Sequence, residues 1–143
     1  MDFLTSFRIC SSGFAAQRAK MDVIASNLAN VSTTSTPEGG PYKRKVAIFS
    51  SENVKQKFRF GDRLRDAIRE VALKEVVEDG ETVRKVYDPS HPDADQQGNV
   101  AMPNVNVMME MTDMITASRA YEACVTAFDA TKNMALKTLD IGK

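Results

Sequence analysis

The first thirty residues carry an apolar seven-residue repeat, and this repeat constrains the fold more than any other feature of the chain. Its positions alternate in steps of four and three, the spacing that places side chains on one stripe of an α-helix. Eight of the nine stripe positions are apolar: Phe3, Phe7, Cys10, Phe14, Gln17, Met21, Ile24, Leu28 and Val31. The repeat therefore predicts a long helix over residues 3–31, which needs a partner because one helix cannot bury such a stripe alone.

A second repeat of the same kind runs through the last forty residues. Its positions are Val107, Met111, Met114, Ser118, Tyr121, Val125, Phe128, Lys132, Ala135 and Leu139. Neither Pro nor Gly occurs between residues 105 and 141, and Asn104 or Asn106 can cap the start. We expect a helix over residues 105–140 that lies antiparallel to the first.

The simplest antiparallel register has the two helices flush at the chain ends, so that facing residue numbers add to about 143. Cys10 and Cys124 would then be offset by about nine residues, or roughly 13 Å along the axis. A disulfide needs α-carbons within about 7 Å. This register therefore predicts two reduced cysteines without a bond between them.

The middle of the chain differs in character, since residues 32–104 hold 24 of the 38 charged residues. Strands are predicted at 42–49, 57–60, 71–77 and 82–87, and residues 63–70 form either a helical turn or a loop. The Asp79-Gly80 turn predicts that the last two strands form a hairpin. Segments 32–41 and 88–98 are rich in Pro, Gly and hydroxyl residues and read as irregular connectors. The fold class is therefore α+β, divided into helix 1–31, a central β-rich region 32–104 and helix 105–143.

Composition argues against several functions. A net charge of zero argues against nucleic-acid binding. No apolar run is long enough for membrane insertion, and the N-terminus lacks a cleavable signal pattern. Only His91, with Asp93 and Asp95, suggests metal or acid–base chemistry, and the flanking prolines favour a fixed turn there. We expect no enzyme, and no catalytic, cofactor or metal site.

Several phrases are specific enough to indicate a family. They are SNLANVSTT at residues 26–34, TPEGGPY at 36–42, YDPSHPDAD at 87–95, MPNVNV at 102–107 and ASRAYEA at 117–123. The first resembles the helix-end signature of flagellar axial proteins, the rod, hook and hook-associated subunits. Together they resemble the proximal rod proteins of the bacterial flagellar basal body. Two positions depart from that pattern: Asn99 replaces a usual aromatic residue, and Cys124 replaces a usual Asn.

The resemblance implies a structural subunit that is exported by the flagellar type III apparatus without a cleaved signal. Such proteins polymerise in the periplasm into the basal-body rod, which surrounds the export channel and transmits torque from motor to hook. The implied partners are copies of the chain, the rod proteins FlgB, FlgF and FlgG, and the FliE adaptor. No cofactor is implied.

The two stripes and the asparagines of the helix-end phrase form the predicted assembly interface. Its residues are Phe3, Phe7, Phe14, Met21, Ile24, Asn27, Leu28, Asn30, Val107, Met111, Met114, Tyr121, Val125, Phe128 and Leu139. The residues alone also allow two other functions. One is a soluble helical adaptor, and the other is a small enzyme that uses His91, Asp93 and Asp95.

Overall fold

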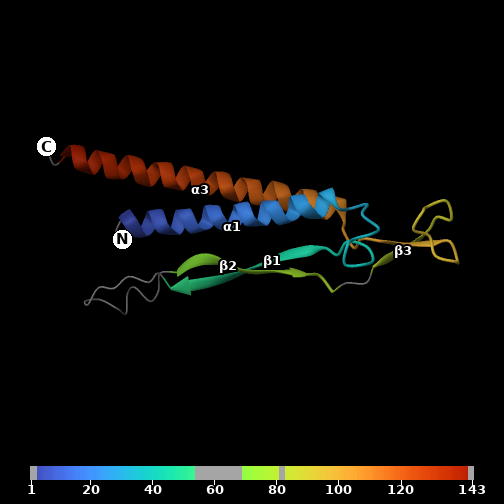
Figure 1. Ribbon diagram of the computed structural model, residues 1–143. Helices are drawn as coiled ribbons and strands as arrows, with labels where there is room; N and C mark the ends of the chain where they lie inside the picture. Colours follow the sequence, from blue (N-terminus) through green and yellow to red (C-terminus); the bar gives the residue numbers. More distant parts are fainter. Residues whose placement is uncertain (1–2, 54–68, 81–82, 142–143) are drawn as a thin grey trace.

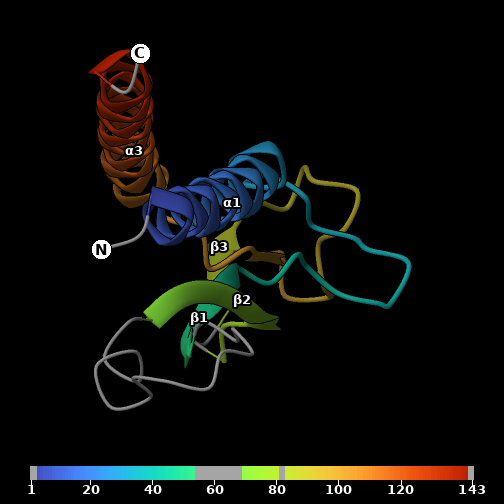
Figure 2. The same ribbon diagram turned by 90° about the vertical axis from the view of Figure 1, so that its left-hand side faces the viewer.

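The computed structural model describes residues 3–53, 69–80 and 83–141, and its main body has three layers. Helix α1 (Phe3–Ala29) lies in the middle, with α3 (Val107–Ile141) on one side (Figures 1 and 2). Strands β1 (Lys45–Asn53) and β2 (Arg69–Glu78) cover the other side. Strands β3 (Arg84–Tyr87) and β4 (Asn99–Met102) lie beyond the end of the helix pair. The predicted α+β fold with an antiparallel helix pair is confirmed.

Both predicted helices are present, and side chains explain where they end. Asn30 donates its Nδ2 to the carbonyl of Ser26 at 2.8 Å, which satisfies a carbonyl of the last turn as α1 ends. Asn106 caps the start of α3, because its Oδ1 accepts the amides of Met108 (3.1 Å) and Met109 (3.3 Å). Asn104, the other candidate cap, instead accepts the backbone amide of Arg44 at 2.8 Å.

The register of the helix pair differs from the flush register predicted from the chain ends. The ring centroids of Phe7 and Phe128 are 4.9 Å apart, and those of Phe14 and Tyr121 are 5.3 Å apart. Facing residue numbers therefore add to about 135 rather than 143. The helices are level where α1 ends and α3 begins. Since α3 has 35 residues and α1 has 27, residues 133–141 extend past the start of α1 (Figure 1). We call this segment the overhang.

At every second position of the α3 repeat, the residue that faces α1 is the one just before the predicted residue. Phe128 lies inward as predicted, but Met111 is 50% exposed and Val125 is 37% exposed. Their predicted places are taken by a second series with seven-residue spacing: Glu110, Ala117, Cys124 and Thr131. Three of these side chains are small, which lets the helix axes approach closely.

Glycine in α1 contributes to the same close approach. A β-carbon added at Gly13 would lie 3.1 Å from the Sγ of Cys124. A larger side chain at this point would therefore push the helices apart. The inward positions at this level are therefore occupied by small side chains, whereas the repeat predicts the more apolar residues there.

The strands pair differently from the prediction. Strand β1 pairs with β2, and β3 pairs with β4, both antiparallel. The predicted hairpin across Asp79-Gly80 is therefore wrong. The amide of Asp79 donates to the carbonyl of Arg44 at 2.7 Å, which continues the β1–β2 ladder beyond the end of β2. Tertiary pairing thus overrides the local turn signal.

The individual strand predictions have mixed outcomes. The strand predicted at 71–77 is confirmed within β2, and the one predicted at 42–49 begins later, at Lys45. The strand predicted at 82–87 begins at Arg84 among the described residues, and β4 was not predicted. The strand expected at 57–60, and most of segment 63–70, lie outside the described residues.

The β1–β2 sheet has an inner and an outer face. Val46 and Val77 are paired and half-buried on the side toward α1. Val71, Leu73 and Val76 are between 42% and 45% exposed on the opposite face. A register shift after Ile48 keeps these three side chains on that outer face. The sheet therefore covers α1 and leaves a second apolar face uncovered.

Candidate functional site

Asn27, on the last turn of α1, is a buried polar residue whose exposed fraction is only 1%. Its Nδ2 donates to the carbonyl of Lys45 at 2.9 Å and to Oε2 of Glu110 at 3.0 Å. Its Oδ1 accepts the amide of Lys45 at 2.9 Å and the hydroxyl of Tyr42 at 3.0 Å. All four hydrogen-bonding positions of the amide are thus used. One side chain ties α1 to the start of β1 and to α3.

Glu110 is fully buried on α3 and meets a charged partner from the sheet. Arg44 donates Nε to Oε1 of Glu110 at 2.6 Å, and its Nη1 lies 3.3 Å from Oδ2 of Asp79. A further carboxylate, that of Asp113, lies 4.0 Å from Nη2. Burial alone lowers the pKa of Arg44, but Glu110 and Asp79 outweigh it and raise that pKa above its usual value. The guanidinium therefore stays charged against the buried carboxylate.

We call Asn27, Tyr42, Arg44 and Glu110 the joint. A buried charge is tolerated only when it is paired and hydrogen-bonded, and here both oxygens of Glu110 have partners. Its geometry offers no nucleophile beside a base. The joint is therefore a structural lock that fixes three elements relative to one another.

An aromatic cluster holds the helix pair further from the joint. Phe14 lies between Tyr121 and Phe128, with ring centroids 5.3 and 5.9 Å away, and Phe7 also packs against Phe128, with ring centroids 4.9 Å apart. All three pairs are tilted, the arrangement that aromatic rings prefer. This cluster uses the predicted stripe residues within one chain.

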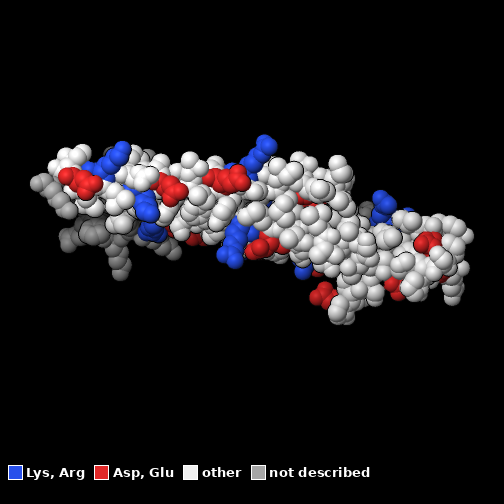
Figure 3. Space-filling view, turned by 90° about the horizontal axis from the view of Figure 1, so that it is seen from above, with Lys and Arg blue, Asp and Glu red and all other residues white. Residues whose placement is uncertain are grey.

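Large apolar side chains remain exposed on the outside of the same helices. Met108, Met111, Ile115 and Val125 are exposed along one flank of α3, beside the face that packs on α1, and we call them the outer stripe. The overhang exposes Met134, Leu136, Leu139 and Ile141. Charged side chains form a few small groups of mixed sign along the helical face seen in Figure 3, with wide uncharged areas between them. Apolar surface of this extent is typical of an interaction face.

The predicted interface residues thus separate into two groups. Phe7, Phe14 and Phe128 pack inside the chain, Ile24 and Asn27 are buried, and Met21, Leu28, Asn30 and Met114 are half-buried. Tyr121 is 36% exposed but its ring packs against Phe14 within the chain, so it belongs with the first group. Val107, Met111, Val125 and Leu139 are exposed. The side chain of Phe3 lies outside the described part of the structure. The second group is the one still available to another subunit.

Sequence reasoning did not identify Tyr42, Arg44 or Glu110 as site residues. Arg44 belongs to the Lys43-Arg44-Lys45 cluster, which looks like a solvated charge run. The available signal was Glu110, a lone carboxylate seven residues before Ala117 on a face that otherwise carries small residues. A charge in that position needs a partner, and an arginine is the side chain that can pair with it when buried.

The segment around His91 is a network of turns. The Nδ1 of His91 accepts the amide of Asp93 at 3.1 Å, and Asp93 accepts the hydroxyl of Thr34 at 2.7 Å. Asp95 accepts the amides of Gln97 and Asn99, and these bonds lower its pKa. Hydrogen bonds from Ser90 similarly lower the pKa of Asp88. These carboxylates shape the loop, and within the described residues no three His, Cys, Asp or Glu side chains gather as metal ligands.

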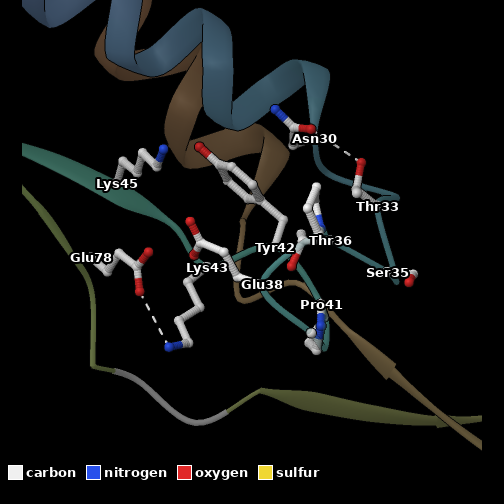
Figure 4. A pocket seen from close by; sticks show the side chains of 12 residues that line it. Asn30, Thr33, Ser35, Thr36, Glu38, Pro41, Tyr42, Lys43, Lys45 and Glu78 are labelled. Carbon is white, nitrogen blue, oxygen red and sulfur yellow. Dashed lines mark hydrogen bonds and ion pairs between the residues drawn. The ribbon is translucent and has the colours of Figure 1, made fainter.

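A pocket of about 470 Å³ lies between the 32–42 connector and the start of β1 (Figure 4). Its charged side chains are of both signs, and Lys43 is paired with Glu78 at 3.2 Å across its edge. Asn30 and Thr33 are hydrogen-bonded to each other at 3.2 Å. The two residues of each pair bind to each other at the pocket wall, and the described lining residues leave no set of charges of one sign to hold a ligand. Neither helix in the described part of the chain has a stretch apolar enough to cross a membrane.

Comparison with known proteins decides what this arrangement serves. A family model for flagella basal body rod proteins matches residues 7–35, and one for the C-terminal part of flagellar basal body rod FlgEFG proteins matches residues 96–141. The flagellar basal-body rod protein FlgC of Borreliella burgdorferi is 40% identical, covering 99% of this chain and 98% of its own. This chain belongs to the FlgC family.

Other members of the FlgC family match over equally long stretches. FlgC of Bacillus subtilis is 39% identical over 96% of this chain and 97% of its own length. FlgC of Salmonella typhimurium is 36% identical over the full length of both chains. The chain is therefore a structural subunit of the flagellar basal-body rod and not an enzyme. The family-model matches fall on α1 and its connector and on β4 with α3, so the helix pair is what FlgC shares with the wider group of rod proteins.

Proposed function

We propose that this FlgC polymerises through its two terminal helices as part of the proximal rod, around the export channel, and transmits torque from motor to hook. In this proposal the helices 1–31 and 105–143 build the inner wall, and region 32–104 faces outward or toward adjacent subunits. The neighbours are copies of itself, FlgB, FlgF and FlgG, and the FliE adaptor. The chain leaves the cell through the type III export apparatus without a cleaved signal and assembles in the periplasm.

The observation that carries the proposal is the outer stripe. Within the chain, the inward faces of α1 and α3 are already paired through the joint and the aromatic cluster. The outer stripe remains exposed on a flank of α3. A contact between this stripe and a different face of the next subunit does not close on itself, so it generates an open helical assembly.

Met111→Asp tests the outer stripe. Because Met111 is half exposed, a carboxylate there remains hydrated in the free chain, and its unfolding free energy should change by no more than about 0.5 kcal/mol. In the rod the same carboxylate would be buried without a partner in every copy. We expect cells that carry this variant to be non-motile and to lack complete rods.

Lys85→Glu is the matched control, since Lys85 is an exposed residue of β3 away from the helices. It should leave motility and rod assembly intact. Motile cells with complete rods carrying Met111→Asp would exclude the outer stripe as an interface. Loss of motility from Lys85→Glu would indicate that assembly also depends on the small β3–β4 sheet.

A further inference from the structure

The two cysteines of the chain lie at one level of the helix pair. Phe7 faces Phe128 on one side of this level, and Phe14 faces Tyr121 on the other. Halfway between these pairs, the α1 stripe presents Cys10, and the facing residue of α3 is Cys124 or Val125. Of these two, Val125 is exposed, whereas Cys124 belongs to the inward series of α3. Cys10 and Cys124 are therefore opposite each other across the helix pair.

The helices are also close together at this level. Gly13 is one turn after Cys10 on the same side of α1, and a β-carbon there would lie 3.1 Å from the Sγ of Cys124. The sulfur of Cys124 thus already lies against the surface of α1. Residues three apart on a helix have β-carbons about 5–6 Å apart. Cys10 is therefore one turn away from the residue that this sulfur faces.

Both thiols are free and half-buried in this structure. The nine-residue offset that argued against a bond between them belonged to the flush register, which the structure corrects. In the observed register the two residues differ by about one position along the axis. That is roughly 1.5 Å of helix rise, so an offset along the axis no longer keeps the two cysteines apart.

We propose that Cys10 and Cys124 are an intrachain cross-linking site that becomes a disulfide once the chain is outside the reducing cytoplasm. This rests on the proposed periplasmic location of the assembled chain. Formation of the S–S bond removes two electrons and two protons from the thiols. A thiol–disulfide oxidoreductase accepts them, and its own disulfide is reduced to two thiols. The product ties α1 to α3 in the register that the aromatic cluster and the joint define.

The test uses rods isolated from cells with all free thiols blocked before lysis. We expect proteolysis without reductant to release one peptide that contains both Cys10 and Cys124, and reductant to separate it. The matched control is Cys10→Ser combined with Ser11→Cys, which moves the thiol to an exposed position next along α1. This variant keeps two cysteines in the chain but should yield no cross-linked peptide.

Two outcomes would overturn the proposal: blocked, reduced cysteines at both positions in isolated rods, or an equal yield of cross-link from the Ser11 control. Absence of the chain from the rods would instead contradict the proposed function. In that case the cysteine pair is tested on the purified chain, by measuring the Cys10–Cys124 cross-link in glutathione buffer with and without urea. We expect the cross-link in native buffer and its loss, at the same redox poise, in urea.

Discussion

At the scale of single residues, Asn27 determines how the chain is held together. It lies in the helix-end phrase and is bonded to Tyr42, Lys45 and Glu110, which belong to two other segments. A glutamine would carry the same groups but place them one methylene further out, where they would collide with their partners. The geometry therefore requires Asn at position 27. The helix-end phrase contains this Asn, but it does not show which residues Asn27 contacts.

We expect Asn27→Ala to destabilise the chain by about 2–4 kcal/mol, because it leaves Oε2 of the buried Glu110 and the amide of Lys45 without their hydrogen-bond partner, while Oε1 keeps Arg44. Urea unfolding followed by circular dichroism measures this loss. Asn30→Ala is the control, since the side chain of Asn30 makes only local bonds at the helix end and should cost about 1 kcal/mol. Equal losses from the two variants would contradict the central role of Asn27.

Asp95 gives a residue-level prediction of pH dependence. Amides of Asn99 and Gln97 lower its pKa below the usual 3.8. Since the folded value is lower than the unfolded one, the charged carboxylate stabilises the turn above pH 3.8, and this contribution is lost as the pH falls through the folded value. Amide NMR shifts of residues 97 and 99 should report a step below pH 3.8. The step should vanish in Asp95→Asn, and a step above 3.8 would contradict the assignment.

At the scale of elements, the seven-residue repeat predicted both helices and their antiparallel pairing but not their register. The predicted and observed sums of facing residue numbers, about 143 and about 135, differ by little more than one repeat. Apolar stripes look nearly the same after such a slip, so hydrophobicity alone cannot distinguish the two registers. The contact between Asn27 and Glu110 does not repeat along the chain, and it selects one register.

The strands show a different limit of sequence reasoning. Local patterns located β2 and β3, but the partner of each strand is set by contacts between distant residues, such as the pairing of Lys45 with Glu78. The short β4 carries no signal of its own, because Asn99 and Met102 enclose only two apolar residues. β4 is a strand because the 88–98 loop brings it beside β3, and this pairing cannot be read from the four residues alone.

The aromatic cluster gives an element-level prediction. Phe128→Asp should lower the free energy of unfolding by about 2–4 kcal/mol and also abolish rod assembly, because it places a charge between Phe7 and Phe14. Leu28→Asp, beside the joint, should do the same. Phe128→Leu, which keeps an apolar side chain, should retain assembly. Urea titration and electron microscopy of basal bodies measure the two effects, and full stability of Phe128→Asp would show that the cluster is not part of the fold.

At the scale of the whole molecule, the overhang is the part of α3 that extends past the start of α1. Leu139→Asp should leave the unfolding free energy unchanged within about 0.5 kcal/mol, since Leu139 is 71% exposed. It should still prevent rod assembly, because an assembled neighbour would have to bury the carboxylate. Lys137→Ala, in the same segment, should be tolerated. Motility and rod counts measure the outcome, and intact rods with Leu139→Asp would leave the overhang without a role in assembly.

The unequal lengths of α1 and α3 have a mechanical meaning for a shaft built from such subunits. If α1 and α3 were level at both ends of the helix pair, subunits could meet end to end like bricks in a stack. Every boundary between subunits would then lie at the same height. An end that projects by nine residues, about 13 Å, would instead lie alongside its neighbour, as timbers do in a lap joint. Torque on such a shaft acts as shear along the apolar surfaces where neighbouring subunits overlap. The boundaries between subunits then lie at different heights, so no cross-section of the shaft contains all of them.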